Sequence, residues 1–254
     1  MSNEFDAQVA RFTRALADAP VIEVGEWQAI RDEGSPFSTT IEIEDVTLRV
    51  PIPASVAEWQ DIVRPNLPWA EEHFGERVSG IPVNPPPSHI RWPFAQKSNE
   101  VHQHDEQFSH TYPERIWPKF AGSGRGPRGI HQGIRYSYGD LNDVIKLLQE
   151  RPATRQAYLP IWFPEDTGAV DGQRVPCTLG YHLMQRAEGL KIVYYIRSCD
   201  FYRHFRDDVY MAGRLAQFVA EAVGTNPSRL VMHISSLHVF EAERGRIEAD
   251  ARGS

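Results

Sequence analysis

The sequence predicts an α+β fold, with a mixed and mainly antiparallel sheet flanked by helices, on three observations. Segments with strand periodicity and segments with helix periodicity occur in mixed order, without the regular alternation of a doubly wound fold. Two strands, Thr178 to Gln185 and Leu190 to Ile196, are separated only by a short turn that contains Gly189, which is typical of an antiparallel hairpin. The chain has 254 residues and is 41% hydrophobic, so it can bury one sizeable core. We therefore expect a single domain over residues 1–254.

The N-terminal part contains one predicted helix and one predicted pair of strands. Residues Asn3 to Ala19 carry apolar side chains at helical spacing, namely Phe5, Val9, Phe12 and Leu16. From Thr39 to Val50 apolar and polar residues alternate, which predicts two paired strands around a turn that contains Asp45.

The middle of the chain, at about residues 81–129, is rich in proline and glycine. It carries eight prolines and ends in a glycine-rich run from Ala121 to Gly129. Proline removes a backbone donor and fixes φ, so we expect an irregular insertion of extended surface segments rather than long regular elements. No Gly-Lys-Ser or Gly-Lys-Thr follows the glycine-rich run, which therefore does not match a phosphate-binding P-loop.

The remaining elements are predicted from periodicity and from helix breakers. A helix begins after Asp140 and ends near Pro152. A strand from about Tyr158 to Phe163 precedes the hairpin. A helix with apolar residues from Tyr210 to Ala222 follows it, and a last strand begins at Leu230.

Composition and charge exclude several classes of protein. A formal net charge of -7 argues against a general nucleic-acid coat, although it allows a local basic pocket for a small anionic ligand. No uninterrupted apolar run reaches membrane-spanning length, and the N-terminus lacks the order of a secretion signal, so we expect a cytoplasmic protein. Two cysteines make no disulfide framework, and a reducing compartment leaves Cys177 as a thiol.

Cys177 and Arg197 place a nucleophile candidate and an anion-binding candidate at the same end of the predicted hairpin. A thiol reacts as its thiolate, and a nearby guanidinium lowers the pKa of a thiol while it also binds phosphate or carboxylate. The pair therefore indicates chemistry on an anionic substrate. The alternatives are that Cys177 is a small buried hydrophobe and that Arg197 forms an ordinary salt bridge.

Four short blocks then follow one another along the chain. They are Pro176-Cys177-Thr178, Arg197-Ser198-Cys199-Asp200, Phe205-Arg206-Asp207-Asp208 and Ser236-Leu237-His238-Val239-Phe240. This ordered set resembles the thymidylate synthase superfamily, and most closely its pyrimidine-nucleotide C5-hydroxymethylase branch, over about Trp117 to Phe240. The resemblance implies a thymidylate-synthase-like fold, a homodimer, a pyrimidine nucleotide as substrate and 5,10-methylenetetrahydrofolate as the one-carbon donor.

The resemblance also implies a reaction. Cys177 adds to C6 of the pyrimidine, which places carbanion character on C5, and C5 then attacks the one-carbon unit. Elimination of the folate leaves an exocyclic methylene, which water converts to hydroxymethyl and hydride converts to methyl. Tyr138 resembles a residue that lines the cleft beside the nucleophile, and core packing is the alternative for it.

A phosphate site is implied by three residues. Arg197 and Ser198 suit a phosphate because a guanidinium fork and a hydroxyl both donate hydrogen bonds. Arg155 resembles the arginine that crosses the dimer interface of the family to bind phosphate. Gln156 stands where many relatives have a second arginine, so one phosphate contact is weakened or replaced.

Asp208 stands where uracil-specific relatives have an asparagine. An amide donates to O4 and accepts from N3–H of uracil, whereas cytosine presents an N4 amine and an N3 acceptor. A carboxyl accepts from N4 and, with a shared proton, donates to N3, so we predict cytosine. The alternative for Asp208 is a first-turn helix acid, a role that Asp207 could fill instead.

The folate and the sugar have their own candidates. Asp200 resembles the acid that holds the folate pterin, and Trp117 resembles a residue of the cofactor cleft; a turn residue and core packing are the alternatives. His238 resembles the sugar-binding histidine of the family. The usual tyrosine partner of this histidine is Phe240 here, and the loss of its hydroxyl favours ribose over deoxyribose, hence CMP over dCMP.

Two departures from the family bear on the mechanism. Aligned on Trp69, the glutamate that usually lies three residues earlier is Asn66, so Glu71 or Glu72 would have to act from a shifted register. The chain also ends soon after Phe240, and we expect a short closing segment to admit water, which favours hydroxymethylation over methylation.

We therefore predict a homodimeric enzyme that converts CMP to 5-hydroxymethyl-CMP. The alternatives are a dCMP hydroxymethylase, a methylating synthase and a non-catalytic nucleotide-binding relative. A metal site is a further alternative, because imidazoles and a carboxylate occur at short spacing at His102, His104, Asp105 and His110. Closely spaced histidines in a polar loop are usually surface residues, so we predict no metal.

Overall fold

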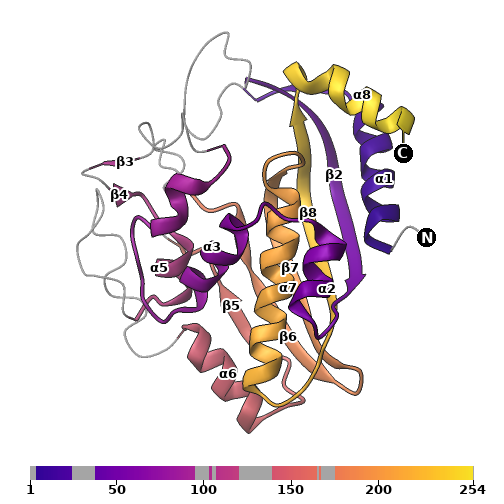
Figure 1. The fold of residues 1–254 in the computed structure, drawn as a ribbon. Helices are drawn as coiled ribbons and strands as arrows, with labels where there is room; N and C mark the ends of the chain where they lie inside the picture. Colours follow the sequence, from indigo (N-terminus) through magenta and orange to yellow (C-terminus); the bar gives the residue numbers. More distant parts are fainter. Residues whose placement is uncertain are drawn as a thin grey trace.

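The computed structural model describes residues 4–24, 38–94, 103–104, 107–119, 139–164, 166 and 175–253. Its main sheet has six strands in the order β1-β2-β8-β7-β6-β5, and only the β7–β8 pair is parallel. Helices α2, α3 and α7 lie together against one side of this sheet (Figure 1). The predicted α+β class, with a mixed and mostly antiparallel sheet, is confirmed.

The elements have the following bounds. The strands are β1 Val21–Glu23, β2 Thr39–Pro51, β3 Gln103–His104, β4 Gln107–Phe108, β5 Tyr158–Pro160, β6 Thr178–Arg186, β7 Gly189–Asp200 and β8 Pro227–Phe240. The α-helices are α1 Glu4–Ala17, α2 Val56–Val63, α3 Trp69–Val78, α5 Tyr112–Ile116, α6 Leu141–Glu150, α7 Phe205–Ala222 and α8 Arg244–Gly253. Two 3₁₀ helices are η1 Pro87–Arg91 and η3 Glu241–Glu243. None of the described helices is long and apolar enough to cross a membrane.

Most of the predicted elements are confirmed. The predicted N-terminal helix is α1, the helix before Pro152 is α6, and the hairpin is β6 and β7, joined at Arg186 and Gly189. Gly189 has a φ of 114°, a left-handed conformation that side chains strain, which explains a glycine in this turn. An Asp140 capping box fixes the start of α6.

The predicted pair of strands around Asp45 is wrong. Residues Thr39 to Pro51 form one strand that pairs with β8 along its length. Asp45 has a φ of 53°, so the chain kinks there without turning back. Ile41 and Ile43 face the core before the kink, and Val46 and Leu48 face it afterwards. The change of parity at Asp45 resembles a turn in the sequence pattern, but the ladder to β8 continues through it.

The same break in alternation crosses three neighbouring strands, β2, β8 and β7, at one level. The core-facing residues change parity between Ile196 and Cys199 in β7 and between Ile234 and Leu237 in β8, as they do in β2. The register aligns these positions, because Val46 and Ile196 both pair with Ile234, and Cys199 pairs with Leu237. In β6 the parity changes separately, at a bulge between Thr178 and Gly180. We call the line across β2, β8 and β7 the alternation break. Arg197 and Ser198 are the two residues of β7 within it.

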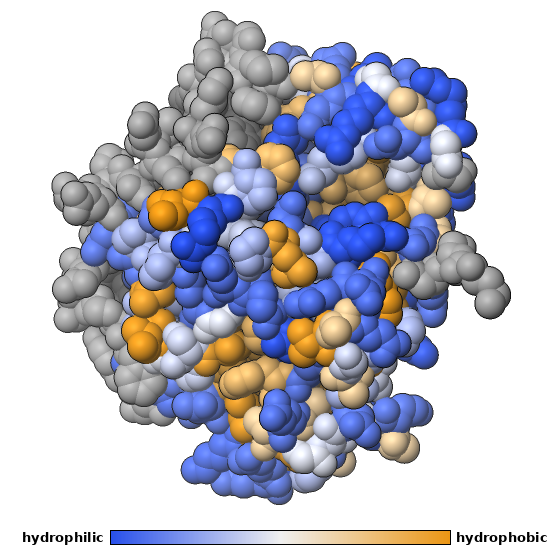
Figure 2. Space-filling view, viewed as in Figure 1, coloured by the Kyte–Doolittle hydropathy of each residue, from blue (hydrophilic) through white to orange (hydrophobic). Residues whose placement is uncertain are grey.

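The helical layer is centred on α7. Gly213 of α7 lies against the Trp59 indole, leaving no room for a Cβ, and Trp59 Nε1 donates to the carbonyl of Tyr210 at 3.0 Å. This close approach seats α2 on α7. The outer face of the helical layer is largely hydrophilic with scattered apolar residues (Figure 2), as is usual for a globular surface.

The described part of the proline-rich region contains short elements only, as predicted. They are η1, the two-residue strands β3 and β4, and α5. The expected surface location is wrong for residues 110–118, which are mostly buried because α5 packs into the core. A buried ion pair anchors α5, since Arg115 donates to both oxygens of Asp166 at 2.7 and 2.8 Å. Lys119 bonds to Asp140 and Asp143 at 3.0 Å each, which ties the end of this region to the start of α6. The domain boundaries stay a prediction.

Candidate active site

Cys177 and Arg197 are adjacent in space, as the hairpin predicts. The Arg197 backbone N–H donates to the carbonyl of Cys177 at 2.9 Å. The Arg197 side chain donates from Nε to Pro176 at 3.0 Å and from Nη2 to Val175 at 3.3 Å, both main-chain carbonyls. Cys177 is partly buried and is not in a disulfide. The segment that carries the thiol is therefore held by the guanidinium beside it, which keeps further N–H donors for an anion.

Ser198 follows Arg197 within the alternation break. It pairs with Ser236 of the parallel strand β8 and is partly exposed. The change of parity lets Arg197 and Ser198 occupy consecutive positions between two buried residues, Ile196 and Cys199. The neighbouring strand β6 has a bulge between Thr178 and Gly180, and bulges commonly re-aim side chains at active sites.

Asp208 lies in the first turn of α7, and its carboxyl has a single recorded partner among the described residues. The Cys199 Sγ is 3.8 Å from Asp208 Oδ2, a weak contact. Burial raises the pKa of Asp208 to about 7, with a further rise from Asp207, against lowering by Arg77 and Cys199. Near neutral pH this carboxyl exists in both protonation states, so it can donate or accept.

The two cysteines differ chemically. Burial raises the pKa of Cys199 well above its ordinary value, and the negative charges of Asp208 and Asp200 add to the rise. Cys199 is therefore a protonated thiol inside the protein, whereas Cys177 is the more exposed of the two.

Asn66, the residue predicted to replace a glutamate of the family, bonds to Asp207. Its backbone N–H and its Nδ2 each donate to one oxygen of Asp207 at 2.8 Å. Glu71 binds Arg214 and Tyr210 of α7, and Glu72 binds Arg91. The hypothesis that Glu71 or Glu72 replaces the missing glutamate is not supported, because both carboxylates are engaged in these contacts.

His238 lies next to a charged cluster at the end of the sheet. It pairs with Asp200 of β7 and Glu42 of β2, and burial lowers its pKa, so the imidazole is neutral at pH 7. The Phe240 ring is buried under the guanidinium of Arg203 at 4.8 Å. His238 is therefore without a hydroxyl partner from position 240.

Asp200 and Trp117 are both bonded within the protein. Asp200 accepts from the backbone N–H groups of Tyr202 and Arg203 at 3.0 and 2.9 Å, and from the Arg203 guanidinium at 3.0 Å. Trp117 is buried, and its Nε1 donates to the carbonyl of Arg77 at 2.8 Å. Both side chains are therefore already engaged within the protein, and their cofactor roles stay predictions.

Arg155 and Tyr138 are not placed at the site by the structure. Arg155 is exposed and its carbonyl contacts His182 Nε2 at 3.0 Å, while its side chain has no hydrogen bond to a described residue. Tyr138 lies outside the described residues, as do His102 and Asp105 of the metal hypothesis. Over the described ranges no group of three metal-binding side chains occurs.

Sequence reasoning missed Arg77 and Tyr112. The Arg77 guanidinium lies over the Tyr112 ring at 4.0 Å, and Thr178 Oγ1 donates to the Tyr112 hydroxyl at 3.1 Å. Burial raises the pKa of Tyr112, and the charges of Cys177 and Asp208 raise it further. A signal existed for Arg77, because it continues the buried stripe of α3 formed by Trp69, Ala70, His73 and Phe74.

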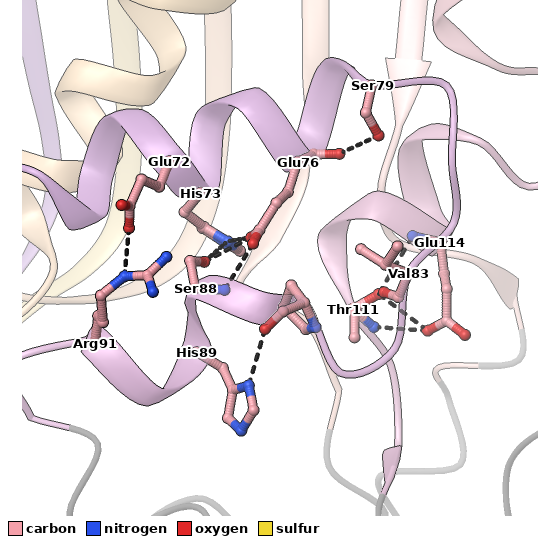
Figure 3. Close-up of polar contacts among 11 residues, drawn as sticks. Glu72, His73, Glu76, Ser79, Val83, Ser88, His89, Arg91, Thr111 and Glu114 are labelled. Carbon is pink, nitrogen blue, oxygen red and sulfur yellow. Dashed lines mark hydrogen bonds and ion pairs between the residues drawn. The ribbon is translucent and has the colours of Figure 1, made fainter.

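A polar network fixes α3 to η1 (Figure 3). Glu76 accepts from the Ser88 backbone N–H at 2.6 Å and from its hydroxyl at 2.5 Å, and it contacts His73 Nδ1 at 3.0 Å. Burial lowers the pKa of His73 to about 4, with a further lowering by Arg77, so His73 is neutral at pH 7. The helix that carries Arg77 is thus held rigidly.

Comparison with known proteins identifies the class. The family model described as thymidylate synthase matches residues 97–250, so this chain belongs to the thymidylate synthase family. It is 27% identical over 148 residues to a protein of Methanosarcina mazei named "Putative thymidylate synthase", which covers 58% of this chain and 60% of that protein. It is 24% identical over 125 residues to a protein of Sphingopyxis alaskensis named "Thymidylate synthase", covering 49% of this chain and 39% of that protein. The chain spans about three-fifths of the first relative's length. The residues matched by the family model, 97–250, do not include β2 and α3.

Proposed function

We propose that this protein transfers a one-carbon unit to C5 of CMP, with addition of water, to give 5-hydroxymethyl-CMP. The observation that carries the proposal is the placement of a thiol and a titrating carboxyl at one site. The negative charges of Cys177 and Asp208 both raise the pKa of Tyr112, so both groups lie near the same phenol. A pyrimidine that reaches both groups could be attacked at one edge and read at another.

Cys177 is the nucleophile in this proposal. Its thiolate forms a bond to C6, and the electron pair of the C5–C6 double bond moves toward C5 and the conjugated ring. The Arg197 side chain donates to the carbonyls of Val175 and Pro176 and so holds this segment in place. Its remaining donors, together with Ser198, bind the phosphate in this proposal.

Asp208 selects cytosine in this proposal. A carboxyl whose pKa is about 7 can carry the proton that N3 of cytosine needs while its other oxygen accepts from the N4 amine. Proton sharing with N3 also makes C6 a better electrophile. Asp207 is not available for this role because Asn66 occupies both of its oxygens.

Ribose is the proposed sugar, because position 240 supplies an aromatic ring packed under Arg203 and no hydroxyl. His238 would contact the sugar as a neutral imidazole. A dCMP hydroxymethylase is the second candidate, and the same residues would serve it.

The family uses 5,10-methylenetetrahydrofolate, which would supply the one-carbon unit when bound. Asp200 and Trp117 are bonded within the protein in the described structure, so folate dependence is proposed from the family and not from these two side chains. We also propose a homodimer in which Arg155 reaches the phosphate of the partner subunit, since its exposed side chain has no partner within the described chain.

Incubation with 5,10-methylenetetrahydrofolate and each of CMP, dCMP, UMP and dUMP tests the proposal, with products identified by mass. We expect hydroxymethyl-CMP from the wild type and none from C177A. A methylated product would show that hydride, and not water, adds to the exocyclic methylene. Exclusive use of dCMP would overturn the ribose assignment. Binding of nucleotide without release of tritium from C5-labelled CMP would indicate the non-catalytic relative.

A further inference from the structure

Arg77 is a buried cation whose guanidinium forms no hydrogen bond to any described residue. It lies in the last turn of α3 and is 5% exposed, and its Nε has no hydrogen bond. Within the described part of the chain, the guanidinium has one recorded side-chain contact, the face of the Tyr112 ring at 4.0 Å. The main chain is fixed here, since the Arg77 carbonyl accepts from Trp117. The cation therefore cannot be explained as a packing element that satisfies its own donors.

Two other arginines of this fold are paired with carboxylates. Arg115 is 1% exposed, and although its Nε also has no hydrogen bond, its two Nη groups bind both oxygens of Asp166. Arg214 binds both oxygens of Glu71 and also Gln217. A buried guanidinium without such partners costs free energy, and it persists where a ligand supplies the acceptor.

Arg77 faces the reacting groups. Tyr112, which it covers, bonds through its hydroxyl to Thr178, the residue after Cys177. The positive charge of Arg77 lowers the pKa of Asp208 against the effect of burial, yet no hydrogen bond joins the two side chains. Arg77, Cys177 and Asp208 thus all lie close enough to Tyr112 to act on its charge, and they come from α3, from the residue before β6 and from α7.

The neighbours of Arg77 favour the ring over the phosphate as its ligand. A phosphate at this place would meet the carboxyls of Asp207 and Asp208, on both of which Arg77 acts electrostatically. A ring carbonyl oxygen is a neutral acceptor that gains negative charge when a thiolate adds to C6. A preorganised buried cation stabilises such developing charge strongly.

We propose, on the basis of the proposed function, that Arg77 is a further substrate-binding residue that donates to a ring carbonyl oxygen of the pyrimidine. When the Cys177 sulfur bonds to C6, the π pair of C5–C6 moves into the conjugated ring, and Arg77 stabilises that charge without giving up its proton. On reversal the pair returns to C5–C6 and the thiolate leaves. Arg77 lies outside the residues matched by the family model.

The test uses R77M and R77K, with R214M as a matched control for loss of a buried arginine elsewhere. Affinities for CMP and for ribose 5-phosphate are measured by titration calorimetry, and melting temperatures are measured with and without CMP. We expect R77M to bind CMP about 10- to 100-fold more weakly, to bind ribose 5-phosphate normally, and to melt no lower than the wild type without ligand. The affinity of R77K for CMP should lie between those of the wild type and R77M. R214M should melt at a lower temperature than the wild type and bind CMP normally.

Other results would overturn the inference. A lower melting temperature of ligand-free R77M with unchanged CMP affinity would make Arg77 structural. Equal losses for CMP and ribose 5-phosphate would make it a phosphate ligand. UMP binding would also be compared between D208N and the double variant R77M/D208N. Equal affinities of these two proteins for UMP would show that Arg77 acts through Asp208 and not on the ring. If the wild type binds no pyrimidine nucleotide, the proposed function itself is wrong. If the wild type and R77M bind CMP equally tightly, only the inference about Arg77 is wrong.

Discussion

The main-chain and side-chain N–H groups of Asn66 occupy both carboxylate oxygens of Asp207, each at 2.8 Å. This contact joins the segment before α3 to the first turn of α7. Among the described residues, the carboxyl of the next residue, Asp208, has one hydrogen-bond contact, a weak one from the Cys199 thiol. Two consecutive carboxyls therefore differ in availability, one bound within the fold and the other open to a ligand.

Substitution of these two acids should separate stability from base choice. D208N should change the CMP to UMP ratio of kcat/KM by at least about 100-fold toward UMP, because an amide matches the N3–H and O4 pattern of uracil. D207N should instead lower the free energy of unfolding by about 1–3 kcal/mol, since an amide nitrogen would face the donors of Asn66. Steady-state kinetics with both nucleotides and urea titrations check this pair. An unchanged base preference in folded D208N would contradict the reading of Asp208.

The ionisation of Asp208 should appear in the pH dependence of stability. Its pKa is about 7 in the folded protein and 3.8 ordinarily, so between these values the folded state holds a proton that the unfolded state has lost. The contribution of Asp208 is therefore greatest below about pH 4 and is lost as the pH rises through about 7, at up to about 1.4 kcal/mol per pH unit. Urea midpoints of wild type and D208N at pH 4 to 8 measure the difference. Parallel curves for the two proteins would refute the shifted pKa.

The two thiols should react at different rates. Cys177 is partly exposed, whereas Cys199 is buried and has a pKa raised well above its ordinary value. Iodoacetamide at neutral pH should therefore label Cys177 in the native protein and leave Cys199 unmodified until unfolding. Mass spectrometry of digested protein identifies the site. C177S should lower turnover by at least about 10³-fold, and C199A should retain it; equal labelling of both thiols would contradict this assignment.

Removal of Arg115 should be far more damaging than removal of a surface arginine. R115M leaves Asp166 as an unpaired buried charge, which should cost about 3–5 kcal/mol. R64M is the matched control, because Arg64 pairs with Asp6 at the surface and its side chain is 54% exposed, so its loss should cost about 0–1 kcal/mol. Denaturant unfolding of both variants checks the contrast. Replacement of both Arg115 and Asp166 by apolar residues should recover much of the loss, and failure to do so would point to packing alone.

Two glycines in helices should respond to alanine with opposite signs. A Cβ at Gly213 would overlap the Trp59 indole, so G213A should destabilise the fold by about 1–3 kcal/mol. A Cβ at Gly75 of α3 meets nothing within 4 Å, so G75A should stabilise it by about 0.5–1 kcal/mol through helix propensity. Thermal melts compare the two. A stable G213A variant would mean that α2 can move away from α7 at little cost.

Much of the fold could be predicted because its elements carry local signals. The helices α1 and α6 and the β6–β7 hairpin show regular periodicity with clear breakers. The kink at Asp45 could not be predicted, because a change of side-chain parity looks the same in sequence whether the chain turns back or continues. Only the ladder from β2 to β8, a pairing of residues far apart in the chain, decides between them.

Part of the candidate site could also be predicted from the sequence, and part could not. Cys177 and Arg197 were found because a short hairpin brings them together and because they belong to motif blocks. Arg77 was missed because its role depends on what surrounds it after folding. In sequence it is an ordinary arginine near the end of a helix, and its buried position beside Tyr112 arises from tertiary packing.

The alternation break constrains how this chain can change over time. Deleting one residue at Ser235 would turn Leu237 and Val239 outward and carry a polar face inward, unless the neighbouring strands lost a residue at the same height. Gains and losses of length at this height must therefore occur together in several strands or not at all. Single side chains in β2, β8 and β7 can be substituted independently, but the spacing of residues across the break can change only in all three strands together.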